Sequence, residues 1–112
     1  MLDPIASRLE NYMDLLAARQ KLVASNVANI DTPGYRTRDI DFQFEYMSHV
    51  DGTGLDVIEP DGLTVKNDGN NVSLDRESRL MAENALRFSM ASTLLRGEIQ
   101  TMKRAIDEGK SS

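Results

Sequence analysis

The chain has 112 residues and a net charge of −5, and its 40% hydrophobic and 28% charged residues are ordinary for a small globular protein. It contains no cysteine, which excludes disulfides, thiolate metal sites and cysteine nucleophiles. Charges interrupt every apolar stretch well before the roughly 20 residues of a membrane span, so we expect no direct membrane insertion.

A first helix is predicted over residues 4–29, because apolar residues recur there at alternating intervals of four and three. Pro4 suits the first helical position after an Asp3 N-cap. The seam formed by this spacing comprises Ile5, Leu9, Tyr12, Leu16, Arg19, Val23, Asn26 and Ile30. A second row, which includes Leu22, runs beside it and widens the stripe, so two neighbours could pack there.

The end of this helix is marked by a turn. Pro33 disfavours helical geometry in the residue before it, and Pro33 with Gly34 predicts a type II turn that needs a positive φ at the glycine. Asn29 is expected to cap the last carbonyls in a left-handed conformation.

Residues 30–73 are predicted to be an irregular connector, and their nine acids against three bases argue against nucleic acid as a partner. Strict alternation over residues 39–46 predicts a strand, with Asp39 and Asp41 on a solvated face. Its partner would be residues 55–58 or 63–65, across turns at 51–52 and 61–62. Residues 66–72 read as a loop.

A second, longer helix is predicted over residues 74–108, with Ser73 as N-cap and Gly109 as the residue just past the end. Its four–three spacing continues without a break for more than four heptads. The residues of this seam are Leu74, Ser78, Met81, Ala85, Phe88, Ser92, Leu95, Ile99, Met102 and Ile106.

The predicted fold is mainly α, a single domain of residues 1–112 in which two long terminal helices form an antiparallel, coiled-coil-like hairpin. At about 1.5 Å per residue the helices would be roughly 39 and 52 Å long, so neither covers the other completely. Apolar rows without an intramolecular partner usually mark interfaces. The simpler alternative is a small hairpin core with no partner.

Candidate catalytic groups are sparse. His49 is the only histidine and has no thiol or second imidazole to work with, so neither a zinc site nor a nucleophile triad can be assembled. The acid pairs have a simpler explanation as solvated polar faces. We therefore expect no catalytic residue, no metal site and no cofactor.

The segment from Ser25 to Arg36 resembles the N-terminal signature of the flagellar axial proteins, which form the rod, hook and hook–filament junction. Its core is Ala28-Asn29 followed by Thr32-Pro33-Gly34-Tyr35 at the end of a heptad helix. Four further segments are similar to proximal rod proteins in particular: residues 38–42, 68–77, 83–88 and 102–109. Residues 43–66 are shorter than in many rod proteins.

This resemblance implies a structural subunit of the bacterial flagellar basal-body rod, a helical assembly that transmits torque for flagellar motility. It implies export from the cytoplasm by the flagellar type III apparatus and assembly in the periplasm near the membrane ring. The implied partners are copies of itself, other rod proteins and the export apparatus, without a cofactor. It also implies terminal segments that stay largely unfolded until assembly.

Two groups of residues are expected to carry this assembly. The assembly motif comprises Asn26, Ala28, Asn29, Thr32, Pro33, Gly34 and Tyr35, and is expected to dock against a neighbour with Tyr35 as a semi-buried anchor. The helix-packing set comprises Ile5, Leu9, Leu16, Leu22, Val23, Met81, Phe88, Leu95, Ile99, Met102 and Ile106. The alternative function is a soluble helical adaptor or flagellar export chaperone that binds a partner helix.

Overall fold

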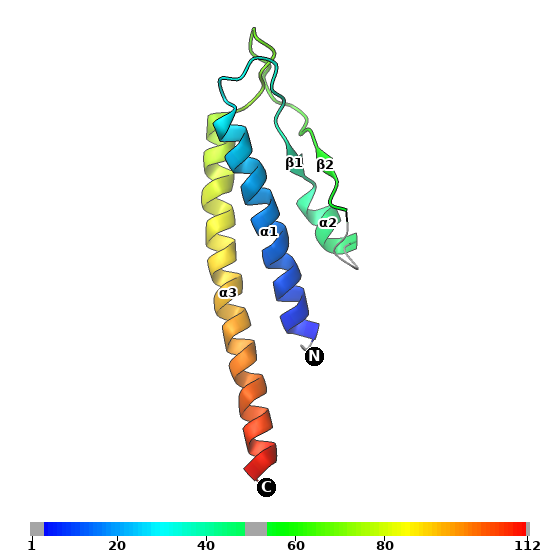
Figure 1. Cartoon of the computed structure of the whole chain (residues 1–112), viewed down its shortest axis with the longest axis vertical. Helices are drawn as coiled ribbons and strands as arrows, with labels where there is room; N and C mark the ends of the chain where they lie inside the picture. The colour runs from blue at the N-terminus through cyan, green and yellow to red at the C-terminus, as the bar shows by residue number, and fades with distance from the viewer. Residues whose placement is uncertain (1–3, 49–53, 112) are drawn as a thin grey trace.

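The computed structural model describes residues 4–48 and 54–111, which form an elongated molecule measuring 71 × 24 × 18 Å. Helices α1 (Pro4–Ala28) and α3 (Leu74–Ser111) lie antiparallel, side by side (Figure 1). Because α3 is 38 residues long and α1 only 25, the C-terminal part of α3 extends beyond the start of α1. The predicted mainly helical hairpin of unequal arms is confirmed.

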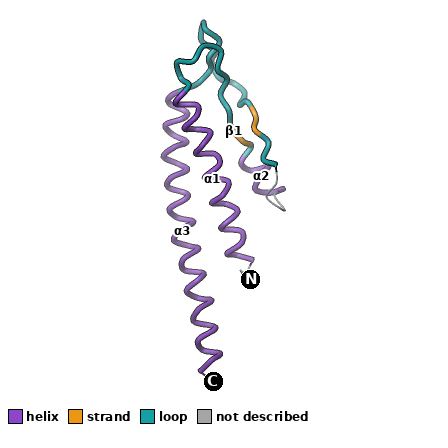
Figure 2. The backbone as a smooth tube through the Cα atoms, viewed as in Figure 1, coloured by secondary structure: helices purple, strands orange, loops and turns teal. Residues whose placement is uncertain are grey.

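Between the two long helices the chain forms an arm, whose described residues are 39–48 and 54–58. It contains strand β1 (Asp39–Ile40), helix α2 (Phe42–Ser48) and strand β2 (Val57–Ile58). The arm runs along the side of α1 that faces away from α3, so α1 is the middle layer (Figure 2). The apolar core accordingly draws side chains from all three layers, among them Leu15, Leu16, Val23, Ile40, Leu80 and Ala91.

The strand predicted over residues 39–46 is correct only at its start. β1 pairs antiparallel with β2, with Asp39 opposite Ile58 and Ile40 opposite Val57. From Phe42 onward the chain is helical, and the Asp41 carboxylate accepts the amide of Phe44 at 3.1 Å as a helix cap. The alternative partner strand at residues 63–65 does not form, and the expected turn at 51–52 lies outside the described residues.

Aromatic packing explains why this segment becomes a helix. Phe42 and Tyr46 are one helical turn apart, and both rings meet Tyr12 of α1 edge-on, with centroids 5.5 and 5.7 Å away. A strand would send residues 42 and 46 to one face as well, but about 13 Å apart, too far for one ring to touch both.

The ends of the long helices confirm one prediction and correct two. The Ser73 hydroxyl accepts the amide of Arg76 at 3.3 Å, as an N-cap should. No described residue other than glycine has a positive φ, so the prediction of a left-handed cap at Asn29 is wrong. The side-chain amide of Asn29 instead donates to the carbonyl of Ser25 at 2.8 Å. Gly109 does not end α3, which continues to Ser111. The expected N-cap Asp3 is outside the described residues.

None of the described helices combines the length and the apolarity that crossing a membrane would require.

Candidate assembly surfaces

The assembly motif folds into a tight turn at the end of α1. Gly34 has a φ of 76°, and the amide of Tyr35 donates to the carbonyl of Thr32 at 3.2 Å, as the Pro33-Gly34 sequence predicts for a type II turn. The hydroxyl of Thr32 donates to the side-chain oxygen of Asn29 at 3.0 Å, which ties the turn back to the helix end.

This turn packs against the chain's own loop of residues 66–72. The side-chain amide of Asn70 donates to the carbonyls of Asn29 and Thr32, both at 2.9 Å, and the amide of Gly34 donates to the carbonyl of Asp68 at 2.8 Å. A Cβ on Gly69 would lie 3.4 Å from the Cα of Gly34. The two glycines therefore allow the two backbones to touch.

Asn71 continues the same contact one residue further along. Its side-chain oxygen accepts the backbone amide of Thr37 at 2.6 Å, and its backbone amide donates to the carbonyl of Tyr35 at 3.3 Å. Asn70 and Asn71 are both buried, with 0% and 2% of their surface exposed. We call residues 29–37 with 66–72 the loop clasp, because side-chain amides here join the chain before α3 to the chain after α1.

Asn26 is the centre of a buried polar network below the clasp. Its side-chain amide donates to Glu77 Oε1 at 2.7 Å and to the carbonyl of Arg38 at 2.8 Å. Its oxygen accepts the amide of Arg38 at 3.0 Å and the hydroxyl of Tyr35 at 3.1 Å. All four hydrogen-bonding capacities of the side chain are used, so Asn26 sets the register of α1, the clasp and α3 together.

Asp39 extends the network into the arm. The prediction that this residue lies on a solvated face is wrong, because only 4% of its surface is exposed. Arg19 of α1 holds its carboxylate with two hydrogen bonds of 2.9 and 3.0 Å, and Arg76 of α3 binds the same carboxylate. Arg76 also pairs with the fully buried Glu77 at 2.7 Å. Charges from α1, the arm and α3 thus neutralise one another.

Burial by itself would raise the pKa of the Asp39 carboxyl, since the charged form loses water. Hydrogen bonds from Arg19 and from the amide of Ile40, with the two guanidinium charges, outweigh burial and hold this pKa below its ordinary value. Burial would likewise lower the pKa of Arg76, but its bonds to Glu77 and Asp39 raise it. Both groups are therefore charged at neutral pH.

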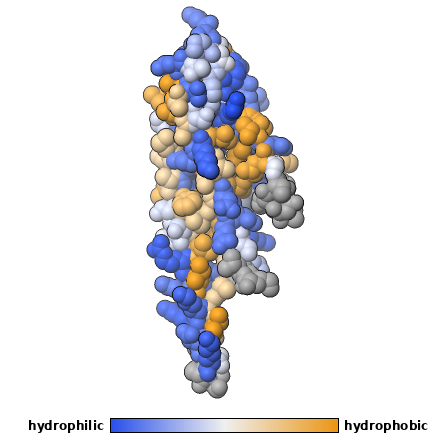
Figure 3. Space-filling view, viewed as in Figure 1, coloured by the Kyte–Doolittle hydropathy of each residue, from blue (hydrophilic) through white to orange (hydrophobic). Residues whose placement is uncertain are grey.

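The seam of α3 is not the row of residues that packs against α1. The buried row is Glu77, Leu80, Asn84 and Ala91, which lies next to the predicted seam and includes two polar residues. Several seam residues stay open, with Phe88 40%, Ile99 37% and Ile106 55% exposed. Apolar side chains also continue along α3 below the start of α1 (Figure 3).

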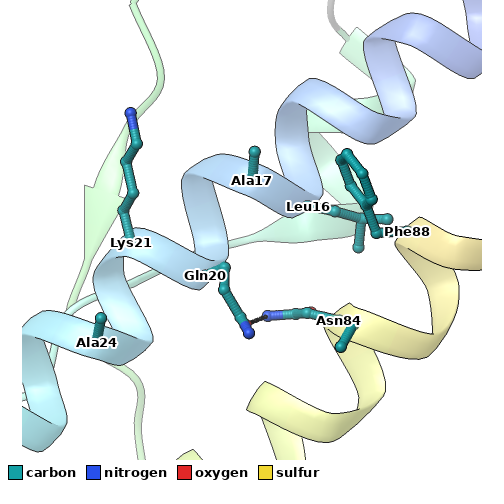
Figure 4. A pocket seen from close by; sticks show the side chains of 8 residues that line it. Leu16, Ala17, Gln20, Lys21, Ala24, Asn84 and Phe88 are labelled. Carbon is teal, nitrogen blue, oxygen red and sulfur yellow. Dashed lines mark hydrogen bonds between the residues drawn. The ribbon is translucent and has the colours of Figure 1, made fainter.

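Beside this seam, a groove of about 540 Å³ separates α1 from α3. Leu16 and Phe88 lie side by side at one end, and the side-chain amide of Asn84 donates to Gln20 at 2.9 Å between the helices (Figure 4). Small residues widen it: Ala17 and Ala24 on α1, and Ala85 on α3. We call this hollow the helix groove.

The remaining residues of the helix-packing set are divided between core and surface. Leu16 and Val23 are buried, whereas Leu9, Leu22, Leu95 and Met102 are half-buried. Ile5 is 57% exposed and Met81 39%. The set thus does not form one continuous contact within the chain; Leu16 and Phe88 are the members that meet across the groove.

The assembly motif is likewise divided between core and surface. Asn26 is buried and Tyr35 is half-buried against α1, where its hydroxyl lies 3.2 Å from that of Ser25. Ala28, Thr32, Pro33 and Gly34 are exposed. Sequence reasoning missed the buried hydrogen bonds of Glu77, Asn70 and Asn71. The available signals were a glutamate in the first turn of a helix and two adjacent asparagines in a turn-rich loop.

His49 lies outside the described residues. Among the residues that the structure describes, no three acidic or histidine side chains gather in a way that would hold a metal ion.

Comparison with known proteins agrees with this arrangement. A family described as "Flagella basal body rod protein" matches residues 13–36, which hold the last four turns of α1 and the turn that follows. The flagellar basal body rod protein FlgB of Yersinia ruckeri is 31% identical over 137 aligned positions, covering 97% of this chain and 100% of that protein.

FlgB of Escherichia coli is 32% identical, covering 97% of this chain and 99% of its own length, and FlgB of Bacillus subtilis is 27% identical, covering 91% and 92%. The 137 and 138 aligned positions exceed the 112 residues here, so the enteric relatives contain residues that this chain lacks. On these similarities, the chain belongs to the FlgB family of flagellar basal body rod proteins.

Proposed function

We propose that the chain is a structural subunit of the bacterial flagellar basal-body rod and assembles through α1 and α3 into a helical tube that transmits torque. The observation that carries this proposal is the open seam of α3, which flanks the contact with α1 and continues past the end of that helix. Family membership supports the same function. The proposal assigns no catalytic step to the chain.

The energetics favour association. Burying a Leu, Ile or Phe side chain that was exposed contributes about 1.5–3 kcal/mol. Phe88, Ile99 and Ile106 are each more than a third exposed, so neighbours that cover them would add several kcal/mol to each subunit. A free chain lacks this contribution, which supports the proposal that its terminal segments are largely unfolded until assembly.

The proposed partners are copies of this chain and other rod proteins, and the assembly motif would present its exposed residues 32–34 to one of them. Export by the flagellar type III apparatus, with assembly in the periplasm near the membrane ring, completes the proposal. Family membership supports both, and both fit a chain without cysteine, which an oxidising compartment leaves unchanged.

The test is a single charge placed in the seam beyond α1. Ile106→Asp leaves the contact between α1 and α3 untouched, so the purified variant should retain the helical circular dichroism of the parent, but it should be absent from isolated basal bodies and should not restore motility. Gln100→Asp is the matched control, since it adds the same charge to an exposed polar position of α3. Normal incorporation of the Ile106 variant would contradict the proposal.

A helical adaptor or export chaperone is the less favoured reading, since the relatives are named as rod proteins. An adaptor should keep its full, cooperative helicity on dilution. A rod subunit should gain helicity as its concentration rises or when its rod partners are added. Circular dichroism across a dilution series separates the two.

A further inference from the structure

A second apolar surface lies on α3, away from the helix groove. Leu86, Met90 and Leu94 are 62%, 58% and 61% exposed and are spaced by four, so they form one ridge along the helix. Successive residues are about 100° apart around a helix, so Met90 lies about half a turn from Phe88, which lines the groove. We call these three residues the outer ridge.

The outer ridge and the helix groove match in length and in relief. From Leu86 to Leu94 the ridge extends about 12 Å, and the α1 wall of the groove from Leu16 to Ala24 also extends about 12 Å. The ridge consists of long side chains, whereas the groove has low points at alanines 17, 24 and 85. Its other lining residues are Leu16, Gln20, Lys21, Asn84 and Phe88. Ridges of large side chains that fill grooves between smaller ones are the usual geometry of helix packing.

We propose that the outer ridge of one copy packs into the helix groove of the next copy in the rod. This inference rests on the proposed function and specifies which surfaces meet. Since α1 and α3 run in opposite directions, a neighbour lying parallel to this copy places its Leu86 near Ala24 and its Leu94 near Ala17. Met90 then faces the middle of the groove, beside Gln20.

The size of this contact favours a row of copies over an isolated pair. A stable interface commonly uses 20–30 residues on each side, and this contact uses three on one side and about eight on the other. Two copies held by it alone would separate. The outer ridge and the helix groove, however, lie on opposite sides of α3, so each copy in a row can use both surfaces. A contact between unlike surfaces leads to an open assembly rather than a closed dimer.

The absence of cysteine makes the test direct. A double variant, Ala17→Cys with Leu94→Cys, is produced in the bacterium that encodes the chain, and basal bodies are isolated, oxidised and analysed on a non-reducing gel. We expect a ladder of dimers, trimers and longer products that reducing agent collapses. Ala24→Cys with Leu86→Cys, at the other end of the groove, should give the same ladder.

The matched control is Ala17→Cys with Leu86→Cys, which combines the same kinds of position about 12 Å out of register and should give no ladder. Basal bodies that contain the Ala17/Leu94 and Ala24/Leu86 variants without a ladder would overturn this pairing and leave the proposed function intact. Dimers formed by the Leu94→Cys variant alone, or disulfide links to a different protein, would also overturn this pairing. Absence of the unsubstituted chain from basal bodies would overturn the proposed function, and this pairing with it.

Discussion

Replacing Asn26 with Ala should remove the side chain that joins α1, the loop clasp and α3. It would leave Glu77 Oε1 and the amide and carbonyl of Arg38 without their partner, whereas the hydroxyl of Tyr35 keeps Ser25 as a neighbour. A buried polar group that loses its partner costs about 1–3 kcal/mol, and Glu77 is fully buried. We expect a loss of about 3 kcal/mol in the free energy of unfolding.

Urea denaturation followed by far-ultraviolet circular dichroism measures this loss, at a concentration at which the parent chain shows its full helical signal. With a slope of about 2 kcal/mol per molar urea, the midpoint should fall by about 1.5 M. If the parent chain is less stable than the loss itself, the variant should lack helical signal even without urea. Asn67→Ala, at an exposed position of the clasp, is the matched control and should move the midpoint little. An unchanged midpoint for the Asn26 variant would refute the role of the buried network.

Two further predictions concern the turn and the arm. Gly34→Val should destabilise the chain by about 1–2 kcal/mol, because a β-branched residue resists a φ of 76° even though nothing lies within 4 Å of its Cβ position. The variant should be exported largely as the parent is, but its incorporation into basal bodies should be impaired. Normal motility would contradict this prediction. The pKa of Asp39 is lowered by folding, so its stabilisation is present above the unfolded value of about 3.9 and is lost as the pH falls through the lower folded value. Asp39→Asn should therefore reduce the loss of unfolding free energy between pH 7 and pH 3, whereas Asn67→Ala, which removes no titratable group, should preserve the parent's pH dependence. Equal pH dependence in all three proteins would count against the assignment.

The two long helices were predictable because their signals are local. Pro4 and Ser73 mark the starts, and the four–three apolar spacing persists through both helices. The C-terminal end of α3 was less well marked, because Gly109 has an ordinary helical φ, and a glycine in that conformation weakens a helix only modestly and need not stop it.

The arm was harder to predict, because its conformation depends on distant partners. Alternation over eight residues fits a strand, but Phe42 and Tyr46 are also one helical turn apart, and only the presence of Tyr12 decides between the two. Asp39 looked like a surface acid for the same reason. The arginines that bind it are 20 residues earlier and 37 later in the sequence, so spacing near Asp39 carries no sign of them.

The position of the α3 seam illustrates a different difficulty. Apolar periodicity identifies a face that avoids water but not which neighbour covers it. Here the intramolecular contact uses the adjacent row, where Glu77 bonds Asn26 and Asn84 bonds Gln20. Polar pairs thus align the two helices of one chain, and much of the stronger apolar row stays exposed.

The loop clasp also bears on how the length of the chain can vary. The clasp and the pairing of β1 with β2 hold together the chain on either side of residues 41–56, so residues added within that stretch would not have to close a new loop. Doubling the length of such a loop costs only about 0.6 kcal/mol. This region is therefore a natural insertion point, where relatives can gain or lose a surface feature without disturbing the helices that assemble.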